Sequence, residues 1–386
     1  MSSTRPHINP QILTWARERV NYDPVQLAGK VPVPVNRYQQ WERGEERPTH
    51  RQLYKLAKVL GRSPGIFHLR QPPEEPQPRL EMRRVYGVAP EEDSPAFSLD
   101  VQRIMNRRDI VLDLLEVLDE HAPEILVSAS LQDNPEQIAR AVREWLGVST
   151  EDQINWENEG VALKAWRNIL ERKGILSFQM QAIPIDQVRG FALNYRPMPV
   201  IAFNSNDSVN GRIFTLFHEA GHILLGESVL HKQFLWQERD QHEFWCNRFS
   251  AAFLLPRDAL LSHPILREKG EQAEWMIREV KTLSRLYKVS AAVMIRRLQT
   301  LNRINTSSYN TIQEEIDRYQ PPESSGGGNF YNTQLARLGT FLPTLAFEGY
   351  YSGEISTRDL AVIMGTKVGN LGRFEEKVMG STYAFR

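Results

Sequence analysis

Two histidines and a glutamate lie within five residues of one another in the segment His218-Glu219-Ala220-Gly221-His222. On a helix, residues four apart share one face, about one turn from each other. Two imidazoles placed in this way can bind one divalent metal ion, and Zn²⁺ accepts such ligands readily. The carboxylate of Glu219 falls beside the metal, where it can act as general base toward a bound water. The pattern H-E-x-x-H therefore predicts a hydrolytic zinc site.

The surrounding residues predict a buried helix from near Asn210 to near Gly226, because apolar residues flank the motif on both sides and a glycine ends it. A catalytic zinc needs a third protein ligand and one open position. The downstream candidates are Glu227, His231, Glu238, Asp240, His242 and Glu243. We expect the ligand to come from a second helix, His242–Leu255, which Pro256 ends. Glu243 is preferred, and His242 remains the alternative because imidazole is an equally good ligand.

Cys246 lies on the same predicted helix. A thiolate could serve as a nucleophile or as a further metal ligand. A lone cysteine on an apolar helix face is more often a small buried residue, and this is the interpretation we adopt.

The sequences FTLFHEAGHILLGE and EFWCNRFSAAFLLP resemble two motifs of the ImmA/IrrE family of zinc peptidases, roughly between Gly160 and Leu301. The family reads R-F-T-x-x-H-E-x-G-H and then E-x-x-A-N-x-F-A-A-x-L-L-x-P. The resemblance implies zinc bound by His218, His222 and Glu243, with Glu219 as base. Departures are Cys246 and Ser250 in place of alanines, and Phe244 and Trp245 after the predicted ligand.

The same resemblance implies a gluzincin-like metalloendopeptidase that acts inside the cell. Its expected substrate is a helix-turn-helix repressor cleaved under stress, or a partner in the control of a mobile element or toxin–antitoxin operon. The strand Pro199–Phe203 resembles the family's edge strand, which would hold an extended substrate by main-chain pairing.

Residues 8–70 resemble the XRE (Cro/repressor-like) helix-turn-helix family. The matching residues are Ala16-Arg17-Glu18, Leu27-Ala28, Trp41-Glu42-Arg43-Gly44, Pro48-Thr49, Leu53 and Leu56-Ala57. The resemblance places a recognition helix at Asn36–Trp41, which would enter the major groove of DNA. Candidate base contacts are Asn36, Arg37, Gln39 and Gln40, and candidate phosphate contacts are Arg43 and Arg47. The alternative role for this segment is a structural or dimerisation module.

Charge supports an anionic partner for the same segment. The whole chain of 386 residues has a formal net charge of zero, yet residues 1–70 hold twelve Lys/Arg and five Asp/Glu, a net charge of +7. The single cysteine excludes an intrachain disulfide and fits a reducing compartment. No apolar leader or membrane-spanning stretch is recognisable, so we expect a cytoplasmic protein.

Proline-rich and glycine-rich stretches divide the chain. We expect an XRE-like helix-turn-helix at 1–70 and a linker at 71–79. A helical connector and the ImmA/IrrE-like zinc peptidase follow at 80–319, then a linker at 320–328 and a small helical tail at 329–386. The expected fold class is α+β and mostly helical, with a zincin-like core that contains a small sheet.

Two functional hypotheses follow. The first is a zinc-dependent endopeptidase and regulator that uses Glu219, Zn²⁺ and a protein substrate. The second is a DNA-binding regulator or antitoxin in which the metallopeptidase fold is a sensor or scaffold without turnover. In a variant of the first, the XRE-like segment binds the active cleft as a pseudo-substrate. A homodimer is an expectation from the resemblance alone.

Overall fold

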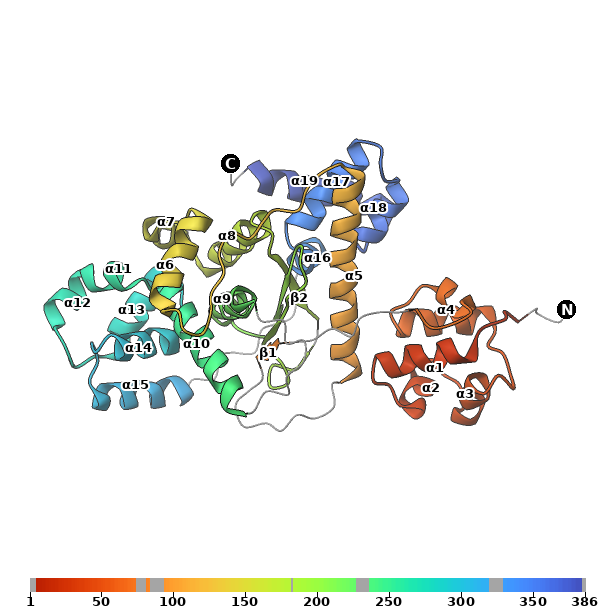
Figure 1. The fold of residues 1–386 in the computed structure, drawn as a ribbon, viewed down its shortest axis with the longest axis horizontal. Coiled ribbons are helices and arrows are strands. Elements are labelled where there is room, and N and C mark those ends of the chain that lie inside the picture. The colour runs from red at the N-terminus through yellow and green to blue at the C-terminus, as the bar shows by residue number, and fades with distance from the viewer. Residues whose placement is uncertain are drawn as a thin grey trace. The chain divides into compact units, whose positions relative to one another are not determined.

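The computed structural model describes residues 5–73, 81–83, 94–181, 183–226, 236–318 and 329–383. The predicted linker at 320–328 and most of the one at 71–79 lie outside these ranges. The chain forms two compact units, one of residues 1–78 with 86–106 and the other of residues 79–85 with 107–386. The expected class, α+β and mostly helical with a small sheet, is confirmed (Figure 1).

The first unit is built from short helices. They are α1 (Pro10–Arg19), α2 (Pro24–Lys30), α3 (Val35–Glu42), α4 (His50–Val59), the 3₁₀ helix η1 (Pro64–His68) and the first part of α5 (Pro95–Val117). Side chains cap two of these helices, because Asp23 and Thr49 each accept a hydrogen bond from the backbone of the first turn that follows. The core of this unit includes Tyr38, Trp41 and Leu99, all buried.

The second unit contains a four-stranded sheet with strand order β1-β3-β4-β2. The strands are β1 (Glu81–Arg83), β2 (Leu176–Met180), β3 (Gly190–Leu193) and β4 (Val200–Asn204). β2 and β4 are parallel, whereas β3 is antiparallel to both β4 and β1. β4 therefore lies inside the sheet, and the expectation that Pro199–Phe203 forms an edge strand was wrong. A fully buried strand of this kind needs partners on both sides to satisfy its backbone groups.

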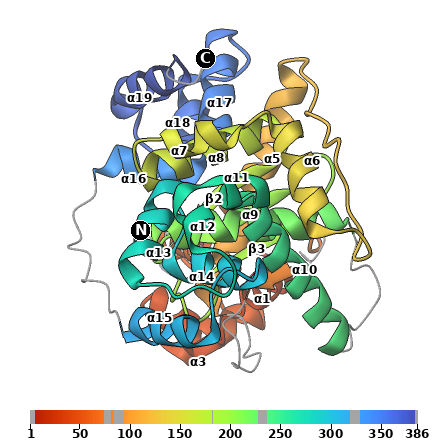
Figure 2. The same ribbon diagram turned by 90° about the vertical axis from the view of Figure 1, so that its left-hand side faces the viewer.

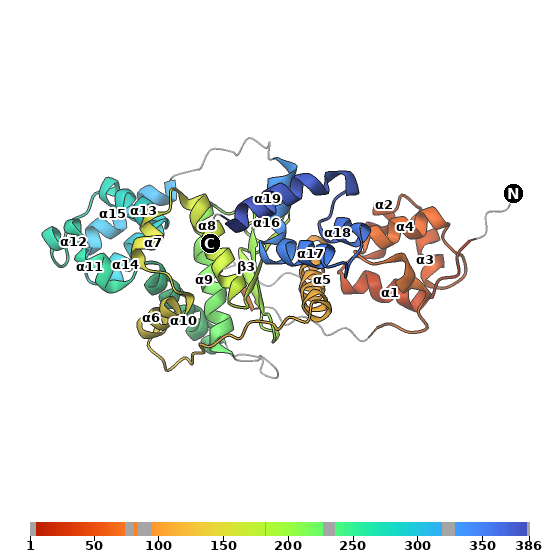
Figure 3. The ribbon, with the colours of Figure 1, turned by 90° about the horizontal axis from the view of Figure 1, so that it is seen from above.

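Helices cover both faces of this sheet. α8 (Glu159–Arg172) and α9 (Val209–Leu225) pack on one face, while the second part of α5 lies on the other (Figures 1 and 3). α10 (Trp236–Leu254) packs against α9 and α6 (Pro135–Leu146). α7 (Thr150–Asn155) precedes α8 in the chain.

The remaining helices of the second unit form two groups. The first follows α10 and is seen together in Figure 2: α11 (Arg257–Ser262), α12 (Pro264–Lys269), α13 (Ile277–Tyr287), α14 (Ala291–Thr300) and α15 (Thr306–Arg318). The second, which we call the C-terminal module, comprises α16 (Phe330–Leu338), α17 (Phe341–Tyr351), α18 (Thr357–Ile363), η2 (Val368–Asn370) and α19 (Leu371–Tyr383). The module packs back on the unit, with α16 against β2 and α17 against α8. Among the described residues, no helix combines the length and apolar composition required to cross a bilayer.

Candidate metal centre

The helix α9 holds the H-E-x-x-H residues in the core of the second unit. Ser208 caps its N-terminus, and Gly226 ends it in the left-handed conformation that glycine adopts most easily. Every residue from Ile213 to Leu225 is buried, and His218 and Glu219 are fully inaccessible. Apolar neighbours on all sides fix the rotation of the helix, so both imidazoles emerge in the same direction.

The second metal-site helix, α10, approaches α9 closely at Gly221. A Cβ atom added at Gly221 would lie 3.0 Å from Cys246 Sγ and 3.3 Å from Phe249 Cδ1. The missing side chain therefore allows the two helices to pack at short range. Glu243 lies one turn before Cys246 on α10, and the close packing brings it over the histidines.

Three side chains that can bind a metal converge at this crossing. His218 Nε2 lies 3.2 Å from His222 Nε2 and 3.2 Å from Glu243 Oε2, and His222 Nε2 lies 3.5 Å from Glu243 Oε1. A tetrahedral zinc ion with bonds of about 2.0–2.1 Å separates its ligands by about 3.3–3.5 Å. The three side chains therefore fit one zinc ion. Among the residues whose side chains the structure describes, His218, His222 and Glu243 are the group of ligand-type residues that could hold a metal ion.

A hydrogen bond orients the first histidine. His218 Nδ1 lies 3.2 Å from Asn247 Oδ1, an acceptor, and this contact favours the tautomer that carries its proton on Nδ1. The lone pair of Nε2 is then directed at the metal position. Hydrogen-bond partners orient metal-binding histidines in the same way in known metal sites. Asn247 was not assigned a role from the sequence. Its position four residues after Glu243 on one helix face is the signal that could have identified it.

The electrostatic environment suits a carboxylate ligand. Burial acts to raise the pKa of Glu243, but hydrogen bonds and charge interactions with His218 and His222 outweigh it, and the pKa lies well below its ordinary range. The side chain of Glu243 is 29% exposed, whereas that of His218 is inaccessible. The site is therefore open to solvent on the side of α10.

Glu219, the residue after His218 on α9, packs against the sheet. A Cβ atom at Gly190, the first residue of β3, would lie 3.3 Å from Glu219 Oε1 and 2.9 Å from the carbonyl oxygen of Ala202. A glycine is required there because β3 runs so close to α9. The carboxylate of Glu219 is thereby enclosed between the metal-site helix and the start of β3.

The other predicted residues have different positions. His242 is not part of the three-residue group. Glu227 and His231 lie outside the described residues, as do the side chains of Glu238 and Asp240.

Two further residues of α10 belong to the core. Cys246 is fully buried against Gly221, as expected for a small packing residue. Trp245 is also buried, stacks on Phe249 and donates a hydrogen bond to the carbonyl of Asp133.

The predicted DNA contacts lie on and after α3. Asn36, Gln39, Arg43 and Arg47 are exposed, while Arg37 and Gln40 are half-buried. Tyr38 and Trp41 alternate with them and are fully buried, so the helix presents its polar face outward.

Two of these arginines are held by carboxylates next to the helix. Arg37 donates to both oxygens of Glu46 at 3.0 and 2.8 Å. Arg43 donates to both oxygens of Glu45 at 2.7 and 3.1 Å. Such paired contacts resemble the contacts that arginine makes with phosphate.

Comparison with known families agrees with this arrangement. Residues 171–299 match the IrrE N-terminal-like domain of the Peptidase M78 family, and residues 13–67 match a helix-turn-helix family. No curated protein matches the chain. The first match spans α9 and α10 with the three converging side chains, and the second runs from within α1 to within η1. The chain therefore joins a helix-turn-helix domain to an IrrE N-terminal-like peptidase domain, which is the architecture that its motifs predict.

Proposed function

We propose that this protein is a zinc-dependent endopeptidase that regulates gene expression by cleaving a protein partner. The observation that carries the proposal is the convergence of His218, His222 and Glu243 at distances that suit one tetrahedral ion. The family match supports a peptidase domain around them. A cytoplasmic location is part of the proposal, in keeping with a single cysteine and a helix-turn-helix domain.

In this proposal the three side chains hold the ion and leave one position open. Bound zinc supplies a Lewis acid that activates water and polarises a peptide carbonyl. Glu219 takes the proton from the attacking water and delivers it to the leaving amine. Its enclosure in a low-dielectric position strengthens its interaction with that proton. Asn247 keeps the imidazole of His218 in the tautomer that can bind a metal.

The helix-turn-helix domain favours a second candidate, a DNA-binding regulator whose metal site does not turn over substrate. The proposed peptidase substrate is a helix-turn-helix repressor or a related partner. DNA would bind through residues 8–70, and a homodimer is proposed from the resemblance only.

The Glu219→Gln variant distinguishes the two candidates. Glutamine has nearly the same shape but cannot accept the proton, so we expect about one zinc per chain to remain while cleavage falls by at least about a hundredfold. Zinc is measured by elemental analysis, and cleavage by mass spectrometry of a proteome-derived peptide library incubated with each protein. Wild-type protein that binds zinc but cleaves no peptide would favour the non-catalytic regulator.

A further inference from the structure

A second site is suggested by a cavity of about 660 Å³ in the second unit. We call it the basic cavity. Its walls come from α8, β2 and α9 on one side and from the C-terminal module on the other. The site is distinct from the metal centre, because none of the three converging metal-site residues lines it. Its volume lies within the range of pockets that bind small molecules.

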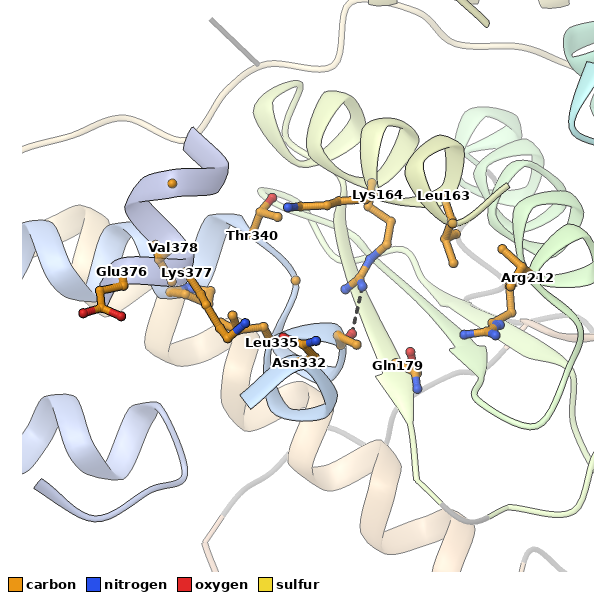
Figure 4. A pocket seen from close by; sticks show the side chains of 17 residues that line it. Leu163, Lys164, Gln179, Arg212, Asn332, Leu335, Thr340, Glu376, Lys377 and Val378 are labelled. Atoms are coloured by element: carbon orange, nitrogen blue, oxygen red, sulfur yellow. Dashed lines mark hydrogen bonds between the residues drawn. The ribbon is translucent and has the colours of Figure 1, made fainter. Parts of the chain in front are cut away.

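Cations dominate the charged groups of the basic cavity. Lys164, Arg167, Arg212 and Lys377 line it, against one carboxylate, Glu376. Figure 4 shows Lys164 extending toward Thr340 and Arg212 extending from α9 toward the same space. The carboxylate of Glu376 is turned away from both. The lining therefore carries a net charge of about +3.

These cations destabilise one another in the absence of an anion. Burial lowers the pKa of Lys164, and the nearby charge of Lys377 lowers it further. Burial also lowers the pKa of Arg167, where Glu171 acts in the opposite direction and Arg212 adds to the decrease. Like charges held close together at a partly buried surface cost free energy that a bound anion would recover.

The side chain of Arg212 has an unsatisfied hydrogen-bond donor. Its Nε atom is buried and has no hydrogen-bond acceptor among the described residues. Burial lowers the pKa of Arg212, and Asp207 only partly opposes this effect. A buried donor without an acceptor is costly, so the guanidinium of Arg212 is not fully satisfied within the described part of the chain. Arg167, by contrast, already donates to Ser177 and to the carbonyl oxygen of Ala336.

Helix N-termini add to the positive potential. The first turns of α8, α9 and α16 contribute Gly160, Val209 and Asn332 to the lining. The positive ends of these helix dipoles favour an anion.

The beginning of α17 provides a precedent within the chain. The carboxylate of Glu171 accepts hydrogen bonds there from the backbone of Thr340 at 2.8 Å and of Phe341 at 2.9 Å. One helix terminus beside the cavity is thus already neutralised by an anion of the protein.

The lining is not only charged. Leu163, Leu335, Pro343 and Val378 supply an apolar part, and Gln179 and Asn332 supply amide groups that can donate and accept hydrogen bonds. A bare inorganic ion would leave most of this surface unused. The combination suits a molecule with a compact anionic group and an uncharged, largely apolar body.

We propose that the basic cavity binds a phosphorylated small molecule about the size of a mononucleotide. Its phosphate would lie among Lys164, Arg212 and Lys377, and its body against the apolar wall. Because the cavity has walls from both the peptidase domain and the C-terminal module, such a ligand would hold the two together. The proposal does not depend on zinc or on proteolytic activity.

The test is calorimetric titration of the full-length protein at low ionic strength, with thermal unfolding as a second measurement. The probes are adenosine 5′-monophosphate, inorganic phosphate and uncharged adenosine. We expect adenosine monophosphate to bind at submillimolar concentration and to raise the Tm, with adenosine at least tenfold weaker. Lys164→Gln and Arg212→Gln should each weaken binding at least tenfold. Arg140→Gln, which changes an exposed arginine on α6 outside the cavity, should leave binding unchanged.

Several outcomes would overturn the proposal. They are no binding of adenosine monophosphate up to millimolar concentration, equal binding of adenosine, or wild-type affinity in the Lys164→Gln variant. Tighter binding of a glutamate-rich peptide than of the nucleotide would assign the cavity to an acidic protein segment instead. Circular dichroism of each variant checks its folding. Lys164 is exposed, so its variant remains informative even if Arg212→Gln fails to fold.

Discussion

His218 and His222 direct their Nε2 atoms to one point because a single helix turn separates them and Asn247 fixes the ring of the first. The residue types and their spacing were sufficient to predict this pair from the sequence. They could not decide between Glu243 and His242, since both are chemically suitable ligands one position apart. Only the rotation of α10 decides it, and that depends on how α10 packs against α9 and α6.

This difference between neighbouring residues leads to a prediction about metal content. Glu243→Ala removes one of three converging ligands, and we expect zinc affinity to fall by more than about a hundredfold, beyond the effect typical of an outer-shell change. His242→Ala should retain about one zinc per chain, because His242 is outside the group. Elemental analysis of both purified variants after dialysis beside the wild type measures this.

The matched pair makes the result interpretable. Both substitutions shorten a side chain at adjacent positions inside α10, so a general loss of helix stability would affect them alike. Zinc loss in His242→Ala with retention in Glu243→Ala would reverse the assignment and require a different rotation of α10.

At the scale of elements, the contact between α9 and α10 depends on Gly221. A methyl group there would lie 3.0 Å from Cys246 Sγ and 3.3 Å from Phe249 Cδ1, so these side chains would have to move by a few tenths of an ångström. We expect Gly221→Ala to lower the free energy of unfolding by about 1–3 kcal/mol relative to the same substitution at a glycine in open space. Chemical denaturation in the presence of a chelator separates this packing effect from any change in zinc binding.

Gly372 in α19 is the control, because a Cβ atom added there would have nothing within 4 Å of it. Gly372→Ala should be neutral or stabilise the protein by up to about 1 kcal/mol, since alanine favours helix. Adding Cys246→Ala to Gly221→Ala removes the closest contact and should restore part of the lost stability. Equal stability of Gly221→Ala and Gly372→Ala would contradict the proposed close packing.

Long elements with clear ends were predictable from the sequence, and short ones were not. α9 combines a buried apolar sequence with a glycine stop, and α4 and α18 each begin with a capping box, whose residue types are recognisable in the sequence. β3 has four residues and β1 three, too few for a periodic pattern to emerge. The position of β4 inside the sheet is set by partners distant in sequence, which local preference does not encode.

At the scale of the whole molecule, sites formed by distant segments escaped sequence analysis. The basic cavity combines residues from α8, α9 and α19, which are separated by up to about two hundred positions, and none of its cations belongs to a motif. The sequence left open whether the C-terminal module contacts the peptidase domain. The buried carboxylate of Glu171 at the start of α17 gives a physical reason for that contact, since it satisfies two backbone donors.

The unequal distribution of charge along the chain also belongs to this scale, and it leads to a prediction about DNA. The first seventy residues carry a net charge of +7 in a neutral chain. Arg43, beside the predicted recognition helix, nevertheless forms an ion pair with Glu45. Glu45→Gln should release that arginine for a phosphate, so we expect DNA affinity to rise several-fold and the salt dependence of binding to steepen by about one unit.

Glu18→Gln removes the same charge from α1 at similar exposure and should change the slope little. Fluorescence anisotropy with duplex DNA over a range of salt concentrations measures both. Identical slopes for the two variants would place Arg43 outside the DNA interface, and no salt-dependent binding at all would assign the domain a structural or dimerisation role.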